Sequence, residues 1–171
     1  MTTNMKATLN INRKATLQRV RSFFNYNYPN YLNLSDLTNY ELKSIDYTQP
    51  HVIQTRRTDA LEKLITQQIE ANLIVMSVQQ AINKCPDRPH APYKTILTER
   101  YLKFHPAWQV ALKIQYSSSQ YNKLQNRALL LFAKKFIIQQ LINKVSQKSL
   151  IDLHIYEDRD TDSKTPHKYL K

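Results

Sequence analysis

The fold of this 171-residue chain is decided by residues 93–136, which read YKTILTERYLKFHPAWQVALKIQYSSSQYNKLQNRALLLFAKKF. Apolar residues recur at helical spacing in three successive segments, 93–104, 106–114 and from Ser118 onward. Ser117 is a good N-cap for the third segment. The stretch therefore predicts a supporting helix, a short helix, a three-residue turn and a longer helix, which is the order of a helix-turn-helix unit.

The apolar side chains of this unit are expected to face one another and form its core. Trp108 and Tyr101 are also most simply interpreted as core residues. The inward positions are Ile96, Leu97, Val110, Ala111, Ile114, Tyr121 and Leu124.

The third helix opens with small polar side chains that can approach base edges in a major groove. Asn and Gln can bond adenine bidentately, and Arg or Lys can bond guanine. The predicted base-contacting residues are Ser118, Ser119, Gln120, Asn122, Lys123, Asn126 and Arg127.

Cations around this helix are predicted to contact phosphates, which fixes position rather than sequence. A lysine-rich helix face is also typical of a merely solvated surface, and that alternative stays open. The predicted phosphate contacts are Arg100, Lys103, Lys113, Lys134 and Lys135.

The chain contains no glycine. Phosphate-cradling loops and nucleophile elbows need glycine where the backbone approaches a ligand closely or takes a positive φ. Nucleotide-binding folds, kinases and the common hydrolases are therefore excluded, and an all-α fold is favoured. No catalytic residue and no cofactor are predicted, and we expect that the protein is not an enzyme.

The net charge of +12 is unevenly distributed. Residues 88–148 carry eleven basic residues and one acid, Glu99, while residues 1–30 carry five basic residues and no acid. This balance indicates an acidic partner, with nucleic acid ahead of an anionic membrane surface. No segment is apolar for long enough to span a bilayer, so we expect a cytoplasmic protein without a membrane partner.

The rest of the chain supplies further predicted helices. An amphipathic helix is expected over 14–26, ended by Tyr28 and Pro29, and a long helix over 58–84, N-capped by Thr58. A polar linker is expected over 34–57, and residues 149–156 fit a strand or a helix remnant. The expected divisions are an N-terminal helix and linker (1–57), a helix-turn-helix domain (58–148) and a C-terminal tail (149–171).

Residues 93–102, 110–117 and 121–133 together resemble the ArpU family of phage-type transcriptional regulators. The resemblance lies in Ile96-Leu97 followed by Arg100-Tyr101, a Tyr-Ser turn, and a third segment ending in Phe132-Ala133. The region also resembles region four of bacterial sigma factors. The resemblance implies a sequence-specific regulator of late, packaging or lysis genes of a phage or prophage in a Gram-positive host. The turn commonly carries Gly in such proteins, whereas Gln115 stands there in this chain.

Two other roles remain open beside the regulator that binds double-stranded DNA. One is a DNA-packaging recognition protein similar to a small terminase subunit, and the other is a sigma-like module that binds RNA polymerase. The helix over 128–142 is apolar on more than one face, so it should pack on the 58–84 helix or on a second subunit of a homodimer.

A few residues were weighed as alternative sites. Asp152, His154, Glu157 and Asp158 fit a metal site only weakly and are expected to be solvated, so no metal is predicted. Asp36, Glu41 and Asp46 fit a nuclease-like carboxylate set equally weakly. Cys85 is expected to be a buried thiol. The aromatic rings of Tyr26, Tyr28 and Tyr31 are expected to pack on the core, with base stacking as the alternative.

Overall fold

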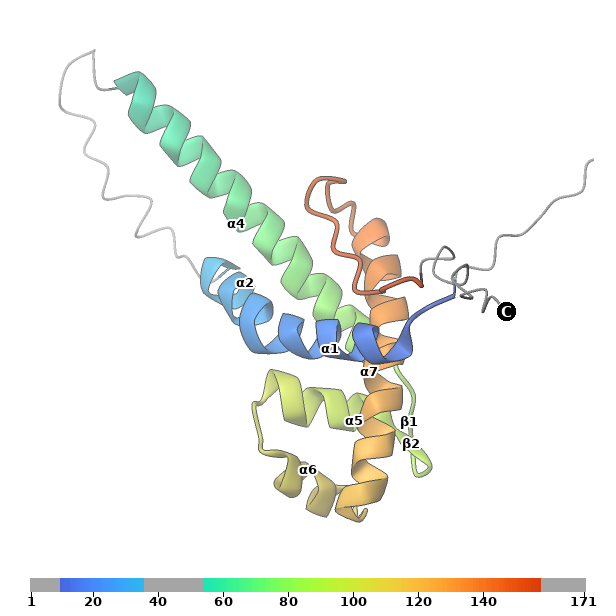
Figure 1. Ribbon diagram of the computed structural model, residues 1–171. Coiled ribbons are helices and arrows are strands. Elements are labelled where there is room, and N and C mark those ends of the chain that lie inside the picture. Colours follow the sequence, from blue (N-terminus) through green and yellow to red (C-terminus); the bar gives the residue numbers. More distant parts are fainter. Residues whose placement is uncertain (1–9, 36–53, 158–171) are drawn as a thin grey trace, which may run out of the picture.

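The computed structural model of the chain describes residues 10–35 and 54–157, whose regular secondary structure is helical apart from one two-stranded sheet and one isolated β-bridge (Figure 1). The predicted all-α fold is confirmed. The elements in chain order are α1 (Arg13–Ser22), the π-helical turn η1 (Phe23–Asn27), α2 (Tyr28–Ser35), α4 (Gln54–Asn83), β1 (Asp87–Arg88), β2 (Ala91–Pro92), α5 (Tyr93–Leu97), the π-helical turn η2 (Thr98–Leu102), α6 (Ala107–Lys113) and α7 (Ser118–Ile142).

The N-terminal helix is longer than predicted. It begins close to the expected position, where the Asn12 side chain accepts a hydrogen bond from the Ala15 N–H. It does not end at Tyr28 and Pro29 but continues through η1 into α2. Proline lacks a donor for the regular helical ladder, and the wider π turn just before Pro29 relaxes that ladder locally. The predicted end was therefore wrong.

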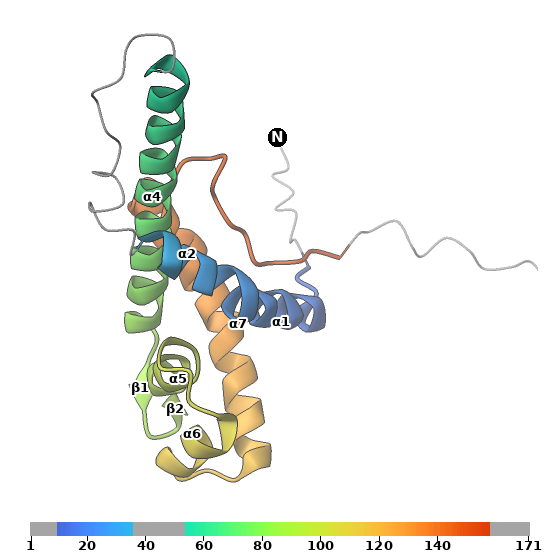
Figure 2. The ribbon, with the colours of Figure 1, turned by 90° about the vertical axis from the view of Figure 1, so that its left-hand side faces the viewer.

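Helix α4 is the longest described helix, and it begins at Gln54 rather than after a Thr58 N-cap. The residues between these two positions include no helix breaker, so the helix extends through them. The C-terminal half of α4 packs against α2 and α7, and Figures 1 and 2 show its N-terminal half projecting beyond the other helices. The expected linker over 34–57 lies mostly outside the described residues.

The main core forms where α1, η1, α4 and α7 meet, and it is rich in aromatic rings. Phe24 stacks on Tyr101 with ring centroids 4.4 Å apart and lies 4.7 Å from Phe132. Phe136 lies 5.2 Å from Phe23. Helix α7 thus buries much of its apolar surface on α1 and α4. Packing on the long helix, now α4, was one of the two predicted options. Three apolar residues of α7 remain exposed, namely Ile138, Leu141 and Ile142.

The segment after α7 is extended and packs on the helices. Leu153 is buried in the main core, and Ile11 and Tyr156 form an isolated antiparallel bridge. The buried Gln140 side chain donates to the Ile151 carbonyl at 2.9 Å and accepts from the Ile151 N–H at 2.9 Å. Residues 150–156 therefore share one core with α1 and α7, and the chain between residues 10 and 35 packs on the same core.

Candidate nucleic-acid interface

Helices α5, α6 and the first turns of α7 form a unit with a small core of its own, at the lower end of the molecule in Figure 1. The bounds of α6 and α7 agree with the predicted segments to within two residues, whereas the first segment is divided into α5 and η2, which together end at Leu102. Leu97 is buried in the main core, and Ile114 is partly buried at the edge of the small one. The core of the unit consists of Ile96, Val110, Ala111, Tyr121 and Leu124.

The turn between α6 and α7 places Gln115 where such turns commonly carry glycine. Gln115 has φ 59°, in the left-handed region that glycine normally occupies after a helix. The Tyr116 N–H donates to the Ala111 carbonyl and the Gln115 N–H to the Leu112 carbonyl, each at 3.1 Å, which closes α6 as a Schellman motif. Phe104 and Lys144, with φ 57° each, follow η2 and α7 in the same way.

The start of α7 is fixed by a capping box, as the sequence predicted for Ser117. The Ser117 hydroxyl accepts from the Gln120 N–H, and the Gln120 side chain accepts from the Ser117 N–H. On the other side of the turn the Tyr116 hydroxyl donates to the Pro89 carbonyl at 2.7 Å, which attaches the turn to the β1–β2 hairpin. The direction in which α7 leaves the turn is therefore held from both sides.

Glu99 is the electrostatic centre of the unit. Its carboxylate accepts from Lys113 at 2.8 Å and from Lys103 at 2.9 Å, and lies 2.9 Å from the His105 Nδ1. These contacts, with Lys113 foremost and Lys103 next, lower the pKa of Glu99 to about 2 against the opposing effect of burial. The acid therefore connects η2, the following loop and α6 through charge-assisted hydrogen bonds.

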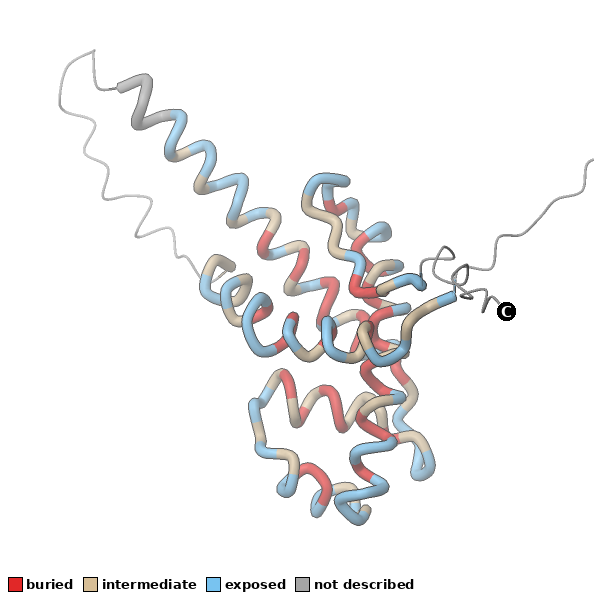
Figure 3. The backbone as a smooth tube through the Cα atoms, viewed as in Figure 1, coloured by how far each residue is buried: buried red, intermediate tan, exposed pale blue. Residues whose placement is uncertain are grey.

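The predicted base-contacting residues lie together on the first three turns of α7, which Figure 3 shows as largely exposed. Lys123, Arg127 and Lys134 follow one another at spacings of four and seven residues, so helical geometry places them on one outward face. Ser118, Ser119, Gln120 and Asn122 are also exposed.

Two of the base-contacting candidates have a side-chain carbonyl oxygen that is already occupied: that of Gln120 accepts within the capping box, and that of Asn126 accepts from a distant residue. Arg21 of α1 donates to the Asn126 oxygen through Nη2. Arg21 was not among the predicted site residues, and it brings the N-terminal cationic segment beside α7. No local pattern could have found this contact, since the two residues lie 105 positions apart.

The predicted phosphate contacts fall into two groups. Lys134 is exposed on α7, and Lys135 is partly buried on the side that faces Cys85. Lys103 and Lys113 pair with Glu99, and Arg100 donates to the His105 carbonyl at 3.0 Å. Lys134 is thus exposed on α7, whereas Lys103, Lys113 and Arg100 also stabilise the unit through their contacts.

Trp108 was expected in the core, and this was wrong, because its side chain is 69% exposed. Helix α6 has only seven residues and turns Val110 and Ala111 inward. Phe104 and Leu112 lie four residues on either side of Trp108 and are exposed as well. Trp108 and Leu112, four residues apart, form an exposed apolar stripe on α6, and Phe104 belongs to the loop before that helix.

Of the N-terminal tyrosines, Tyr28 is buried and Tyr31 is partly buried, as expected, whereas Tyr26 is exposed. Cys85 is buried, and burial raises the pKa of its thiol to about 11, so the thiol stays protonated and unreactive at neutral pH.

The alternative metal and nuclease sites divide between described and undescribed residues. His154 and Asp152 form a close pair, with Nδ1 2.7 Å from the carboxylate. Within residues 10–35 and 54–157 no group of three or more His, Cys, Asp or Glu residues could hold a metal ion. Asp158 and the set Asp36, Glu41 and Asp46 lie outside the described residues.

Comparison of the chain with protein-family models, with curated proteins and with solved structures finds no match. None of the helices in the described part of the chain combines the length and the apolar character needed to cross a lipid bilayer.

Proposed function

We propose that this protein is a sequence-specific regulator of transcription that binds double-stranded DNA through α7. The proposal rests on the two different faces of the first three turns of α7, one buried and apolar, the other exposed and polar or cationic. Tyr121 and Leu124 anchor them in a small core. The exposed residues there, Ser118 to Gln120, Asn122, Lys123 and Arg127, are polar or cationic.

The dimensions and the chemistry of this surface suit a major groove. A helix with its side chains is about 10–12 Å across, and the groove is about 12 Å wide. Asn122 supplies an amide for adenine and Arg127 a guanidinium for guanine. The excess of cations in residues 88–148 supplies a salt-dependent attraction to phosphates.

The biological context of the proposal comes from the ArpU-like and sigma-like resemblance. It places the regulator in the cytoplasm of a bacterial host, acting on late, packaging or lysis genes of a phage or prophage. Gln115 supports the resemblance in one respect, because it takes the left-handed conformation for which such a turn normally uses glycine.

A homodimer accompanies this proposal, since many helix-turn-helix proteins read paired half-sites. Ile65, Ile69 and Met76 share an exposed face of α4, with spacings of four and seven residues, while Ile74 and Val78 are buried. A second copy of the chain packed on that face would cover the stripe. A ring of many subunits would instead favour a packaging protein.

One observation favours the sigma-like alternative as a second candidate. The exposed apolar stripe of Trp108 and Leu112 lies on α6, the helix that precedes α7, and exposed apolar side chains of this kind are typical of a protein interface. In that case the protein would bind promoter DNA only in the presence of RNA polymerase.

The proposal is tested by selecting duplexes from a random double-stranded pool with the full chain alone and with RNA polymerase added. Enrichment of one motif by the chain alone is the expected result. Enrichment only with polymerase present favours the sigma-like module. If no motif is enriched under either condition, the proposal of sequence-specific binding is overturned.

A further inference from the structure

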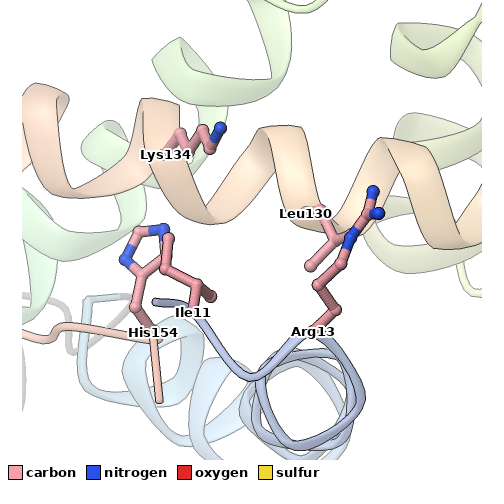
Figure 4. Close-up of a pocket in the computed structure, with 5 residues that line it drawn as sticks. All are labelled: Ile11, Arg13, Leu130, Lys134 and His154. Atoms are coloured by element: carbon pink, nitrogen blue, oxygen red, sulfur yellow. The ribbon is translucent and has the colours of Figure 1, made fainter. Parts of the chain in front are cut away.

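A pocket of about 280 Å³ lies where the start of α1, the middle of α7 and the C-terminal segment meet. It is lined by Ile11, Arg13, Leu130, Lys134 and His154. Figure 4 shows Lys134 and Leu130 on α7, Arg13 extending toward Leu130 from α1, and the imidazole of His154 facing α7 beside Ile11. No acidic side chain is among the five lining residues.

His154 is the buried polar group of this pocket. Its side chain is 8% exposed, and its Nδ1 lies 2.7 Å from the Asp152 carboxylate. Within residues 10–35 and 54–157, the other ring nitrogen, Nε2, is buried and has no hydrogen-bond partner. Buried polar atoms are nearly always hydrogen-bonded, so an unpaired ring nitrogen beside a pocket indicates a ligand atom that completes it.

The charges that line the pocket favour a negatively charged ligand. Arg13 and Lys134 contribute two cations, and Arg13 is the first residue of α1, whose first turn contains no acid. The N-terminus of a helix carries partial positive charge from the peptide dipoles. The Asp152 carboxylate is held by the His154 Nδ1, its backbone N–H and the Tyr156 hydroxyl.

We propose that this pocket binds a phosphate group of the DNA backbone beside the sequence that α7 contacts. The Arg13 guanidinium matches phosphate oxygens bidentately, Lys134 adds a second charge, and the His154 Nε2 is the polar atom that a phosphate oxygen would complete. Ile11 and Leu130 provide apolar walls for the attached sugar. The same donors would also hold a free phosphate or a phosphate monoester.

The position of Lys134 on α7 favours DNA as the source of the phosphate. Lys134 shares the outward face of Lys123 and Arg127 and lies about 10 Å beyond Arg127 along the helix axis. A duplex in contact with the first turns of α7 would therefore continue toward the pocket. That the phosphate belongs to DNA rests on the proposed function. The inference also assigns a phosphate as the partner of Arg13 in the N-terminal segment.

The decisive experiment compares Arg13→Ala and Lys134→Ala with Lys14→Ala, which removes the same charge from an exposed residue outside the pocket lining. The duplexes are the selected sequence with long flanks and the same sequence trimmed to the contacted bases. Circular dichroism checks that each variant keeps its helices.

On the long duplex, Arg13→Ala and Lys134→Ala should each weaken binding about three- to tenfold and lower the salt slope by about one, with base preference unchanged. Lys14→Ala should change neither quantity. On the trimmed duplex the three variants should bind alike. If the pocket variants bind the long duplex with the same affinity and salt slope as Lys14→Ala, the phosphate does not come from DNA.

A second measurement separates this proposal from the proposed function. Inorganic phosphate is titrated into the full chain while the ¹⁵N signal of the His154 Nε2 is followed. A shift in the wild type that is absent from the Arg13→Ala, Lys134→Ala double variant supports the phosphate site even if no duplex is selected. If neither the long duplex nor phosphate moves this signal, the pocket is not a phosphate site.

Discussion

The Lys113 ammonium donates to the Glu99 carboxylate at 2.8 Å, although the two residues lie on different elements and 14 positions apart. Glu99 is 7% exposed, while its two lysine partners are about half exposed. The burial of this one acid is therefore offset by charges that reach in from the surface. The contact holds α6 against η2 and so helps to fix the angle at which α7 begins.

The first prediction concerns Glu99→Gln. The pKa of Glu99 is about 2 in the folded protein, against an ordinary value of 4.5, so the stabilisation is fully present above pH 4.5 and is lost as the pH falls toward 2. Glu99→Gln should lower the free energy of unfolding by roughly 1–3 kcal/mol at pH 7. The difference from wild type should shrink to near zero at pH 2.

Urea unfolding at pH 7, 4 and 2.5 measures this difference. Glu62→Gln is the control. Because Glu62 is exposed on α4, this substitution should change the free energy of unfolding little at any pH. A constant difference between Glu99→Gln and wild type across the three pH values would show that Glu99 acts through packing and not through charge.

The second prediction concerns the left-handed residue in the turn. Gln115 holds φ 59° without the freedom of glycine, which costs on the order of 1 kcal/mol. Gln115→Gly should therefore raise the free energy of unfolding by up to about 1 kcal/mol, visible as a higher Tm. Gln109→Gly in the middle of α6 is the matched control and should destabilise. Equal destabilisation by both changes would contradict the strain argument.

The third prediction concerns base recognition. Arg127→Ala and Asn122→Ala should each relax base preference at one position of the selected site and cost roughly 1–3 kcal/mol for a bidentate contact. Repeating the duplex selection with each variant measures this directly. Lys63→Ala, on exposed α4, serves as the control for loss of charge. Unchanged motifs for both α7 variants would mean that α7 is not the recognition helix.

The fourth prediction concerns the oligomeric state. If a second copy covers the exposed stripe of α4, Ile69→Lys should shift the mass from dimer to monomer without loss of helicity. Size-exclusion chromatography with light scattering at micromolar concentration provides the measurement. Leu112→Lys, in the exposed apolar stripe of α6, is the control and should remain dimeric. A monomeric wild type at micromolar concentration rules out the dimer.

Sequence pattern predicted the parts of this protein that are set locally. The bounds of α6 and α7 and the N-cap at Ser117 follow from interactions within a few residues, and the absence of glycine marked Gln115 as the unusual position of the turn. Helical periodicity also identified the small core, because inward positions recur at a fixed spacing.

The features that only the tertiary structure decided are those that depend on which surfaces pack together. Periodicity marks an apolar face but not what covers it, so Trp108 was placed in the core although α6 is too short to bury it. Pro29 ends a regular helix, and only the π turn before it shows why this one continues. Arg21 meets Asn126, and Arg13 and His154 line one pocket, only because α1, α7 and the last segment cross. The sequence by itself determined α6, α7 and the position of the turn between them; the packing of distant segments decided which cations lie together.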